Sequence, residues 1–223
     1  MKTMQRMVLM KKMLFCLAVV LLVGGCINLT VVPCPAARAD AAAVIYPLLD
    51  ATMENLTDAI LSVSFEAGDV YLDDTGKLQM NVKIYTHDQY DLVDIALLQV
   101  GDTLVTHAGE VAVLSVERMG DGTVSINGGW EADGLSLMTH EGGVYYAVSA
   151  NDAKDWYEIG EATIRVSADF IGYDQADLEL GEVIFYPGSF LMGEVTNYDF
   201  TPYNTTIRVE AGQVMELHRV YMP

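Results

Sequence analysis

Alternation of apolar and polar residues is the main pattern of the chain from Ser62 onward. Every second residue is apolar in 78–84, in 164–170 and in 207–210, as in a strand with one buried and one solvated face. The run 111–116 is apolar on both sides and predicts a central strand. A period of two over most of the length favours β-sheet.

Turn-forming residues separate these runs. Asp121-Gly122 predicts a type I′ hairpin, because both residue types tolerate positive φ. Gly142-Gly143, Ala211-Gly212 and the stretch 73–76 mark further tight connections. Short strands with turns about every 8–12 residues are typical of a sandwich or barrel. We therefore expect an all-β fold, an antiparallel β-sandwich or distorted barrel.

One segment between the N-terminal region and the strands has a helical period instead. Apolar residues recur at spacings of three and four across 40–61, which predicts one amphipathic N-terminal helix. Pro47 suits its first turn. This helix would pack on a sheet or act as a spacer between membrane and domain. Residues 90–98 fit a short helix or a strand equally well.

The N-terminus has the three-part layout of a bacterial secretory signal. Four basic residues precede the uncharged apolar stretch 13–23, and small residues follow it. Leu22-Val23-Gly24-Gly25-Cys26 resembles the lipobox of bacterial lipoproteins, in which the cysteine carries the lipid. An A-x-A site at 37–39 would instead release a soluble protein, and an apolar span of about 20 residues could remain as an uncleaved membrane helix. Lipid attachment at Cys26 is our first expectation.

The domain organisation follows from this assignment. Residues 1–39 are expected to be the signal peptide, or a lipoprotein signal with a short tether, and residues 40–223 a single acidic, mostly β domain. The Gly-rich stretch 128–134 is the candidate subdomain boundary. The three cysteines, Cys16, Cys26 and Cys34, all lie in the export segment. A domain of about 184 residues can rely on its hydrophobic core alone, since it buries roughly 70% of its unfolded surface.

The export segment conceals how acidic the domain is. It holds five basic and no acidic residues, so its removal takes the net charge from −19 to −24, with 7 basic and 31 acidic residues remaining. Such a surface repels phosphates and anionic lipids. We therefore expect no nucleic-acid partner, and membrane contact only through the N-terminal lipid or signal segment.

Motifs for known chemistry are absent from the sequence. There is no nucleophile elbow, zinc motif, EF-hand or phosphate loop, so no cofactor, metal site or catalytic residue is assigned. A catalytic triad can still assemble from residues distant in sequence. The histidines are each isolated and are expected at the surface or at strand edges: His87, His107, His140 and His218.

Acidic groups and aromatic residues carry two weaker hypotheses. The groups fit turn aspartates, with weak calcium binding by one loop as the alternative: Asp73/Asp74, Asp88/Asp91/Asp94, Asp152/Asp155 and Asp169/Asp174/Asp177. Aromatic rings are expected to fill the core and cross-strand positions. Trp156 lies in a polar stretch and is the ring that we expect to be exposed.

These observations predict an extracytoplasmic protein, lipid-anchored or secreted. Its expected function is that of a non-enzymatic binding or structural module of a bacterial cell envelope, with an envelope protein or glycan as partner. The alternative is a secreted hydrolase acting on polysaccharide or peptidoglycan. A groove with facing carboxylates or a His–Asp pair would favour the hydrolase, and one flat aromatic or apolar patch would favour the binding module.

Overall fold

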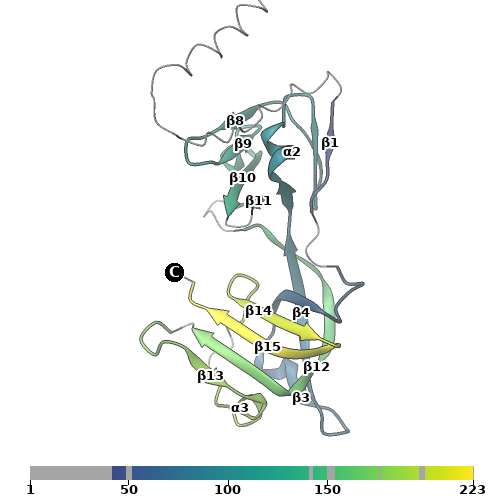
Figure 1. Cartoon of the computed structure of the whole chain (residues 1–223), viewed down its shortest axis with the longest axis vertical. Coiled ribbons are helices and arrows are strands. Elements are labelled where there is room, and N and C mark those ends of the chain that lie inside the picture. Colours follow the sequence, from purple (N-terminus) through teal and green to yellow (C-terminus); the bar gives the residue numbers. More distant parts are fainter. Residues whose placement is uncertain are drawn as a thin grey trace, which may run out of the picture. The chain divides into compact units, whose positions relative to one another are not determined.

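The computed structural model describes residues 42–48, 52–140, 143–149, 154–175, 177–195 and 199–222. The export segment, with the expected lipid-attachment residue Cys26, lies outside the described residues. All described residues belong to one compact unit, Arg38–Pro223, drawn in Figure 1. This unit is mostly β-structure, which confirms the predicted all-β class. No helix among the described residues is long and apolar enough to cross a membrane.

The strands fall into two groups, each with its own hydrophobic core. The first group comprises β2 (Ala59–Ser64), β3 (Val70–Leu72), β4 (Leu78–His87), β12 (Trp156–Gln175), β13 (Val183–Phe185), β14 (Thr205–Glu210) and β15 (Gln213–Val220). The second comprises β1 (Val44–Ile45), β5 (Gln89–Asp91), β6 (Thr103–Thr106), β7 (Gly109–Ala112), β8 (Val116–Arg118), β9 (Val124–Ile126), β10 (Leu135–His140) and β11 (Val144–Val148). The helical segments are short: η1 (Ala67–Asp69), α2 (Leu92–Ala96), η2 (Trp130–Ala132) and α3 (Pro187–Leu191).

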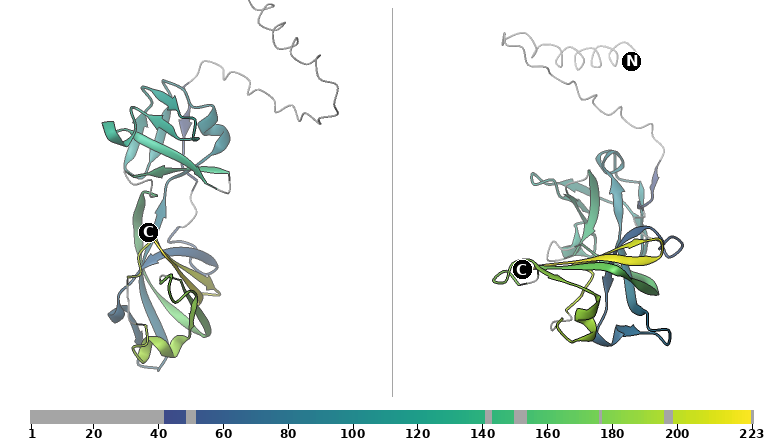
Figure 2. Two further views of the ribbon diagram at one scale, coloured as in Figure 1. Left: turned by 90° about the vertical axis from the view of Figure 1, so that its left-hand side faces the viewer. Right: turned by 60° about the horizontal axis from the view of Figure 1, so that its bottom comes forward.

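The first group forms a distorted barrel. Its strand order is β13-β12-β15-β14-β2-β4-β3, and β12 also pairs with β4. This additional pairing closes β12, β15, β14, β2 and β4 into a ring, with β13 and β3 as outer strands. β12 can join both sides because it is 20 residues long and bends along its length (Figure 1, Figure 2). Its ladder with β4 is antiparallel, whereas its ladder with β15 is parallel, contrary to the expected all-antiparallel pairing.

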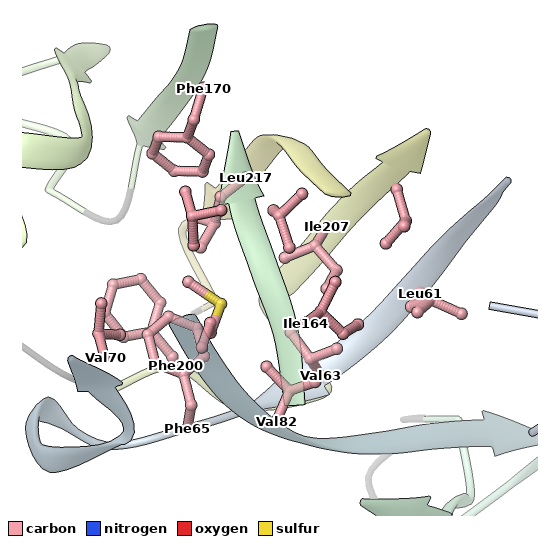
Figure 3. Packing of buried hydrophobic residues seen from close by; sticks show 14 of the residues in the cluster. Leu61, Val63, Phe65, Val70, Val82, Ile164, Phe170, Phe200, Ile207 and Leu217 are labelled. Carbon is pink, nitrogen blue, oxygen red and sulfur yellow. The ribbon is translucent and has the colours of Figure 1, made fainter. Parts of the chain in front are cut away.

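Alternation along β4 builds the barrel core. Leu78, Met80, Val82 and Ile84 are all buried, and the residues between them are half-buried or exposed. Strands β2, β12, β14 and β15 turn their own apolar residues to the same interior, as Figure 3 shows for the labelled side chains that belong to them. Each fully buried side chain of this size stabilises the fold by about 1.5–3 kcal/mol. The period of two therefore identified the buried face of these strands correctly.

The second group is organised around Tyr90. Two sheets, β1-β6-β7 and β5-β11-β10-β9-β8, together with α2 enclose this core. Tyr90 is completely buried, and its hydroxyl donates a hydrogen bond to the carbonyl of Val105 at 3.0 Å. The ambiguous segment 90–98 contains both expected elements, because β5 runs directly into α2. Asp91 caps that helix by accepting a hydrogen bond from the N–H of Val93 at 2.7 Å.

The helix expected across 40–61 is wrong. Val44–Ile45 is instead β1, which pairs in parallel with Thr103–Leu104 of β6, and β2 begins at Ala59. A buried hydrogen bond from the N–H of Ala43 to the Asp102 carboxylate, 2.7 Å long, holds the first segment beside β6. Pairing with distant strands has overridden a local period that favours a helix.

The central strand expected at 111–116 is also wrong. The run is divided between β7 and β8, each of which is the last strand of its sheet, and Leu114 is 74% exposed. The side-chain oxygen of Asn127 accepts hydrogen bonds from the N–H groups of Leu114 and Ser115. A side chain therefore satisfies these two backbone donors, whereas in a central strand they would bond to the backbone of a neighbouring strand.

The expected subdomain boundary does not coincide with the change of core. The stretch 128–134 joins β9 and β10, which pair with each other in one sheet. The chain passes from the barrel core to the second core between β4 and β5, and returns between β11 and β12.

One turn differs from its predicted type, and a second, predicted only as a tight connection, has the type I′ pattern. The Asp121-Gly122 hairpin between β8 and β9 is confirmed, but only Gly122 has a positive φ, of 93°, so the turn is not type I′. The type I′ pattern occurs between β14 and β15, where Ala211 and Gly212 have φ of 48° and 72°. Alanine is strained in this region because its Cβ approaches the following carbonyl oxygen.

Replacing Ala211 by asparagine is expected to raise the free energy of unfolding by about 1 kcal/mol, because Asn-Gly is the favoured type I′ pair. Ala211 is exposed, so the larger side chain has room. Chemical denaturation of the two proteins measures the difference. Ala211→Val is the matched control and should lower stability, since β-branched residues tolerate positive φ poorly. Equal stability of all three proteins would contradict the inference that the backbone is strained at Ala211.

Candidate functional site

The histidines occupy different environments. His218 fits the expected surface position, with 46% of its side chain exposed. His87, the last residue of β4, is only 6% exposed, so the expectation is wrong for that residue. His107, in the turn after β6, is exposed as expected, with 31% of its side chain accessible. The side chain of His140 lies outside the described part of the chain.

A His–Asp pair that no local sequence motif indicates joins His107 of the β6–β7 turn to Asp88, which lies between β4 and β5. Asp88 is 2% exposed and accepts hydrogen bonds from the backbone N–H of His107 at 2.9 Å and the Tyr157 hydroxyl at 3.2 Å. The His107 Nδ1 lies 3.0 Å from the same carboxylate. The rings of His107 and Tyr157 stack 4.1 Å apart. Burial, with the nearby charge of Asp88, raises the pKa of Tyr157 to about 12.

This cluster is arranged for structure. Both carboxylate oxygens of Asp88 contact groups of the chain itself, and Tyr157 covers one face of the His107 ring. Neither of the two grooves described below is lined by any member of the cluster. General base catalysis requires the base to reach a substrate proton. The pair therefore gives little support to the hydrolase alternative.

The larger groove is polar and has a volume of about 780 Å³. Its lining includes the carboxylates of Glu66, Asp69 and Glu161. Glu66 and Asp69 each accept a hydrogen bond from the other's backbone in the capping box of η1, and Glu161 lies 3.7 Å from the Lys83 Nζ. A glycosidase needs two carboxyl groups in contrasting environments, one protonated and one ionised. These three instead serve the local structure of a charged surface; the lining also holds a fourth carboxylate, that of Asp199.

The acidic groups considered for calcium include turn and cap residues, whereas Asp88 and Asp174 pair with His107 and Arg219. Asp73 accepts hydrogen bonds from both N–H and hydroxyl of Thr75 and from the N–H of Lys77. These hydrogen bonds, led by that from Lys77, hold the pKa of Asp73 well below its ordinary value. Asp177 similarly accepts from the N–H groups of Glu179 and Leu180. Within the described ranges, no three His, Cys, Asp or Glu side chains are grouped to hold a metal ion.

The tryptophans differ from expectation. Trp156, expected to be exposed, is half-buried, with its ring centre 4.5 Å from that of His87. The ammonium group of Lys154 lies 5.5 Å from the Trp156 ring centre. Trp130 in η2 is the more exposed of the two, at 44%. The expected exposure of Trp156 is therefore wrong.

The second groove, which we name the edge groove, follows β13 and has a volume of about 630 Å³. Its apolar wall consists of Leu178, Leu180, Val183, Ile184 and Tyr221. Leu178 and Leu180 are 70% and 71% exposed, and the other three between 44% and 49%. Exposed apolar side chains gathered in this way are typical of binding surfaces. This groove is the candidate functional site.

Two buried contacts hold the edge groove in shape. Phe185 of β13 stands opposite Gly172 of β12, and a Cβ added to Gly172 would lie 2.2 Å from the Phe185 ring. The aromatic ring therefore rests directly on the β12 backbone. Asp174 and Arg219 form a two-pronged ion pair beside it, with a 2.9 Å hydrogen bond from the Arg219 Nε. Arg219 also packs over the Phe200 ring at 4.4 Å.

Sequence reasoning missed the edge groove because its pattern resembles a buried strand. Apolar residues at 178, 180 and 183 are separated by polar or small residues, which ordinarily predicts a face turned to the core. Leu178 and Leu180 lie in the turn before β13, and Val183 lies in the last strand of its sheet. The position of that strand depends on contacts between distant residues. The sequence feature that could have indicated the groove is the number of apolar residues among the acidic residues of 177–185.

The chain was compared with protein-family models, with curated proteins and with solved structures, and none of them matches it.

Proposed function

We propose that the protein is an exported, non-enzymatic binding module of a bacterial cell envelope and that it holds its partner in the edge groove. The observation that carries the proposal is the exposed apolar wall of this groove, formed by Leu178, Leu180, Val183, Ile184 and Tyr221. Burying apolar surface is worth about 25 cal/mol per Å², so a partner that covers these side chains gains binding free energy.

The proposed location outside the cytoplasm rests on the N-terminal sequence pattern. A basic segment, an uncharged apolar stretch and the lipobox-like Leu22–Cys26 pattern support export followed by lipid attachment at Cys26. The strongly acidic domain suits a soluble surface outside the cytoplasm. Export and lipid attachment remain predictions, and the groove-based part of the proposal does not depend on which signal cleavage occurs.

Site-specific crosslinking tests the proposal in intact bacterial cells that export the full chain. A photoreactive residue replaces Leu180, and a discrete crosslinked adduct is expected. Adding Ile184→Glu should abolish that adduct, because a carboxylate in the apolar wall opposes partner burial. The matched control carries the photoreactive residue at Leu114, which is equally apolar and 74% exposed but lies outside the groove.

Two outcomes would overturn the proposal. The first is that the photoreactive residue gives the same set of adducts at position 180 as at position 114, since the groove would then bind no partner selectively. The second is release of soluble fragments from purified peptidoglycan by the purified chain, abolished by His107→Gln. That result would assign activity to the Asp88–His107 pair and favour the hydrolase.

A further inference from the structure

Strand β13 leaves one side of its backbone unpaired. Val183, Ile184 and Phe185 stand opposite Asp174, Tyr173 and Gly172 of β12, and β13 ends the sheet. Among the described residues, no other strand pairs with β13. In an antiparallel ladder, alternate residues direct their N–H and C=O groups away from the partner strand. The outer N–H and C=O groups of β13 therefore have no strand partner among the described residues, and the three residues of β13 also line the edge groove.

An exposed apolar edge of this kind is a template for a further strand. Natural proteins usually protect such edges with charges, proline or a covering segment. In β13 the two residues beside the groove are instead valine and isoleucine, 44% and 49% exposed. A strand added here would gain main-chain hydrogen bonds and place alternate side chains against the apolar wall.

Charge decides which occupant fits. The described residues lining the edge groove include three acidic side chains outside any ion pair of the groove, those of Asp177, Glu179 and Glu194. Arg219 is the one basic residue in this lining, and it is paired with Asp174. A second copy of the chain would bring the same acidic rim and a similarly negative domain, so self-association is opposed. A cationic segment is attracted to the same rim.

We propose that the edge groove binds an extended peptide in which apolar residues alternate with lysine or arginine, added as a strand to β13. This inference rests on the proposed function and names the class of partner. The unpaired edge of β13 requires the peptide to be extended, and the apolar wall requires apolar side chains at alternate positions of the peptide. The carboxylates of Asp177, Glu179 and Glu194 favour positive charge on the peptide.

The test uses the full chain in nanodiscs of neutral phosphatidylcholine. The probe is a fluorescent, end-capped peptide of about nine residues that alternates lysine with valine, since a strand-adding ligand is extended and reads alternate side chains. Fluorescence anisotropy should report saturable binding. A peptide with prolines in place of two central valines, and one with glutamate in place of lysine, should each bind at least about tenfold more weakly.

Matched protein variants locate the binding. Ile184→Glu and the double variant Glu179→Gln/Glu194→Gln should each weaken the lysine–valine peptide about tenfold or more, and only the second should flatten the dependence on salt. Leu114→Glu and Glu110→Gln change the same residue types outside the groove and should bind as wild type does. Circular dichroism of each variant establishes that it is folded.

Three results would overturn strand addition. They are no saturable binding of the lysine–valine peptide, equal binding of the proline or glutamate peptides, and concentration-dependent dimerisation of the chain that Ile184→Glu removes. The crosslinking in intact cells is a separate readout. A selective adduct at position 180 without binding of the lysine–valine peptide would contradict strand addition but would still support a binding module. Absence of both the adduct and the peptide binding would contradict the edge groove as a binding site.

Discussion

Asp174→Asn is expected to lower the free energy of unfolding by about 3 kcal/mol, because it removes a carboxylate that pairs with a buried guanidinium. Only 5% of the Arg219 side chain and 19% of that of Asp174 are exposed. The substitution preserves the size of the side chain, so the effect reports charge and hydrogen bonding. Urea or guanidinium denaturation near neutral pH measures it.

Two further variants distinguish loss of the ion pair from a general destabilisation caused by the substitution. Asp174→Asn/Arg219→Met removes both charges and should recover part of the loss, since replacing a buried pair by apolar groups is often close to neutral. Glu210→Gln makes the same carboxylate-to-amide change in the exposed pair with Arg208, where a much smaller loss is expected because solvent screens the pair. A similar small loss for Asp174→Asn would show that the buried pair adds little.

This pair also bears on the edge groove. Asp174 and Arg219 come from β12 and β15, which are neighbouring strands, and both residues line the groove. A pair that is buried and two-pronged fixes its side chains more firmly than an exposed pair. Its loss should therefore reduce peptide binding through the shape of the groove as well as reducing stability.

The sequence reveals those parts of the fold that depend on neighbours along the chain. The period of two in 78–84 identified the buried face of β4, because a strand exposes alternate residues to alternate faces. Closure of the barrel depends on β12 meeting both β4 and β15, and its contacts join residues as distant as Lys83 and Glu158. No local period records such a pairing. The same limit explains why β1 was predicted as part of a helix.

The candidate site was less predictable than the fold. Leu180 and Ile184 have the same residue types as core positions, but Leu180 lies in the turn before β13 and Ile184 lies in β13, the outermost strand of its sheet. The burial of His87 and Asp88 likewise depends on rings contributed by other strands, Trp156 and Tyr157 of β12. Sequence alone shows such residues as isolated in the chain, so neither the groove nor the buried histidine could be inferred from it.

His87 should make the protein sensitive to mild acid. Its ring packs edge-on against Trp156 and Tyr146, and among the described residues its Nδ1 has no hydrogen-bond partner. Burial, assisted by the positive charge of Lys154 and opposed by Asp88, lowers the pKa of His87 from 6.5 to about 4. The folded state therefore excludes a proton that the unfolded chain accepts.

The sign of the effect follows from linkage. Above a pH of about 6.5, His87 is neutral in both states, and its contribution to folding is retained; as the pH falls from there towards about 4, the unfolded state gains a proton and stability is lost. The full loss is about 3 kcal/mol, of which about 2 kcal/mol should occur between about pH 7 and pH 5. Denaturation curves at those two values, where most carboxylates stay ionised, measure it.

His87→Phe provides the decisive comparison, because it keeps a ring between Trp156 and Tyr146 and removes the titrating group. Its free energy of unfolding should change little between about pH 7 and pH 5, and at the lower pH it should exceed that of wild type. His218→Gln, at an exposed histidine beside Glu216, should retain the wild-type loss. If His87→Phe loses as much stability as wild type over the same interval, the acid sensitivity arises elsewhere and His87 is not its source.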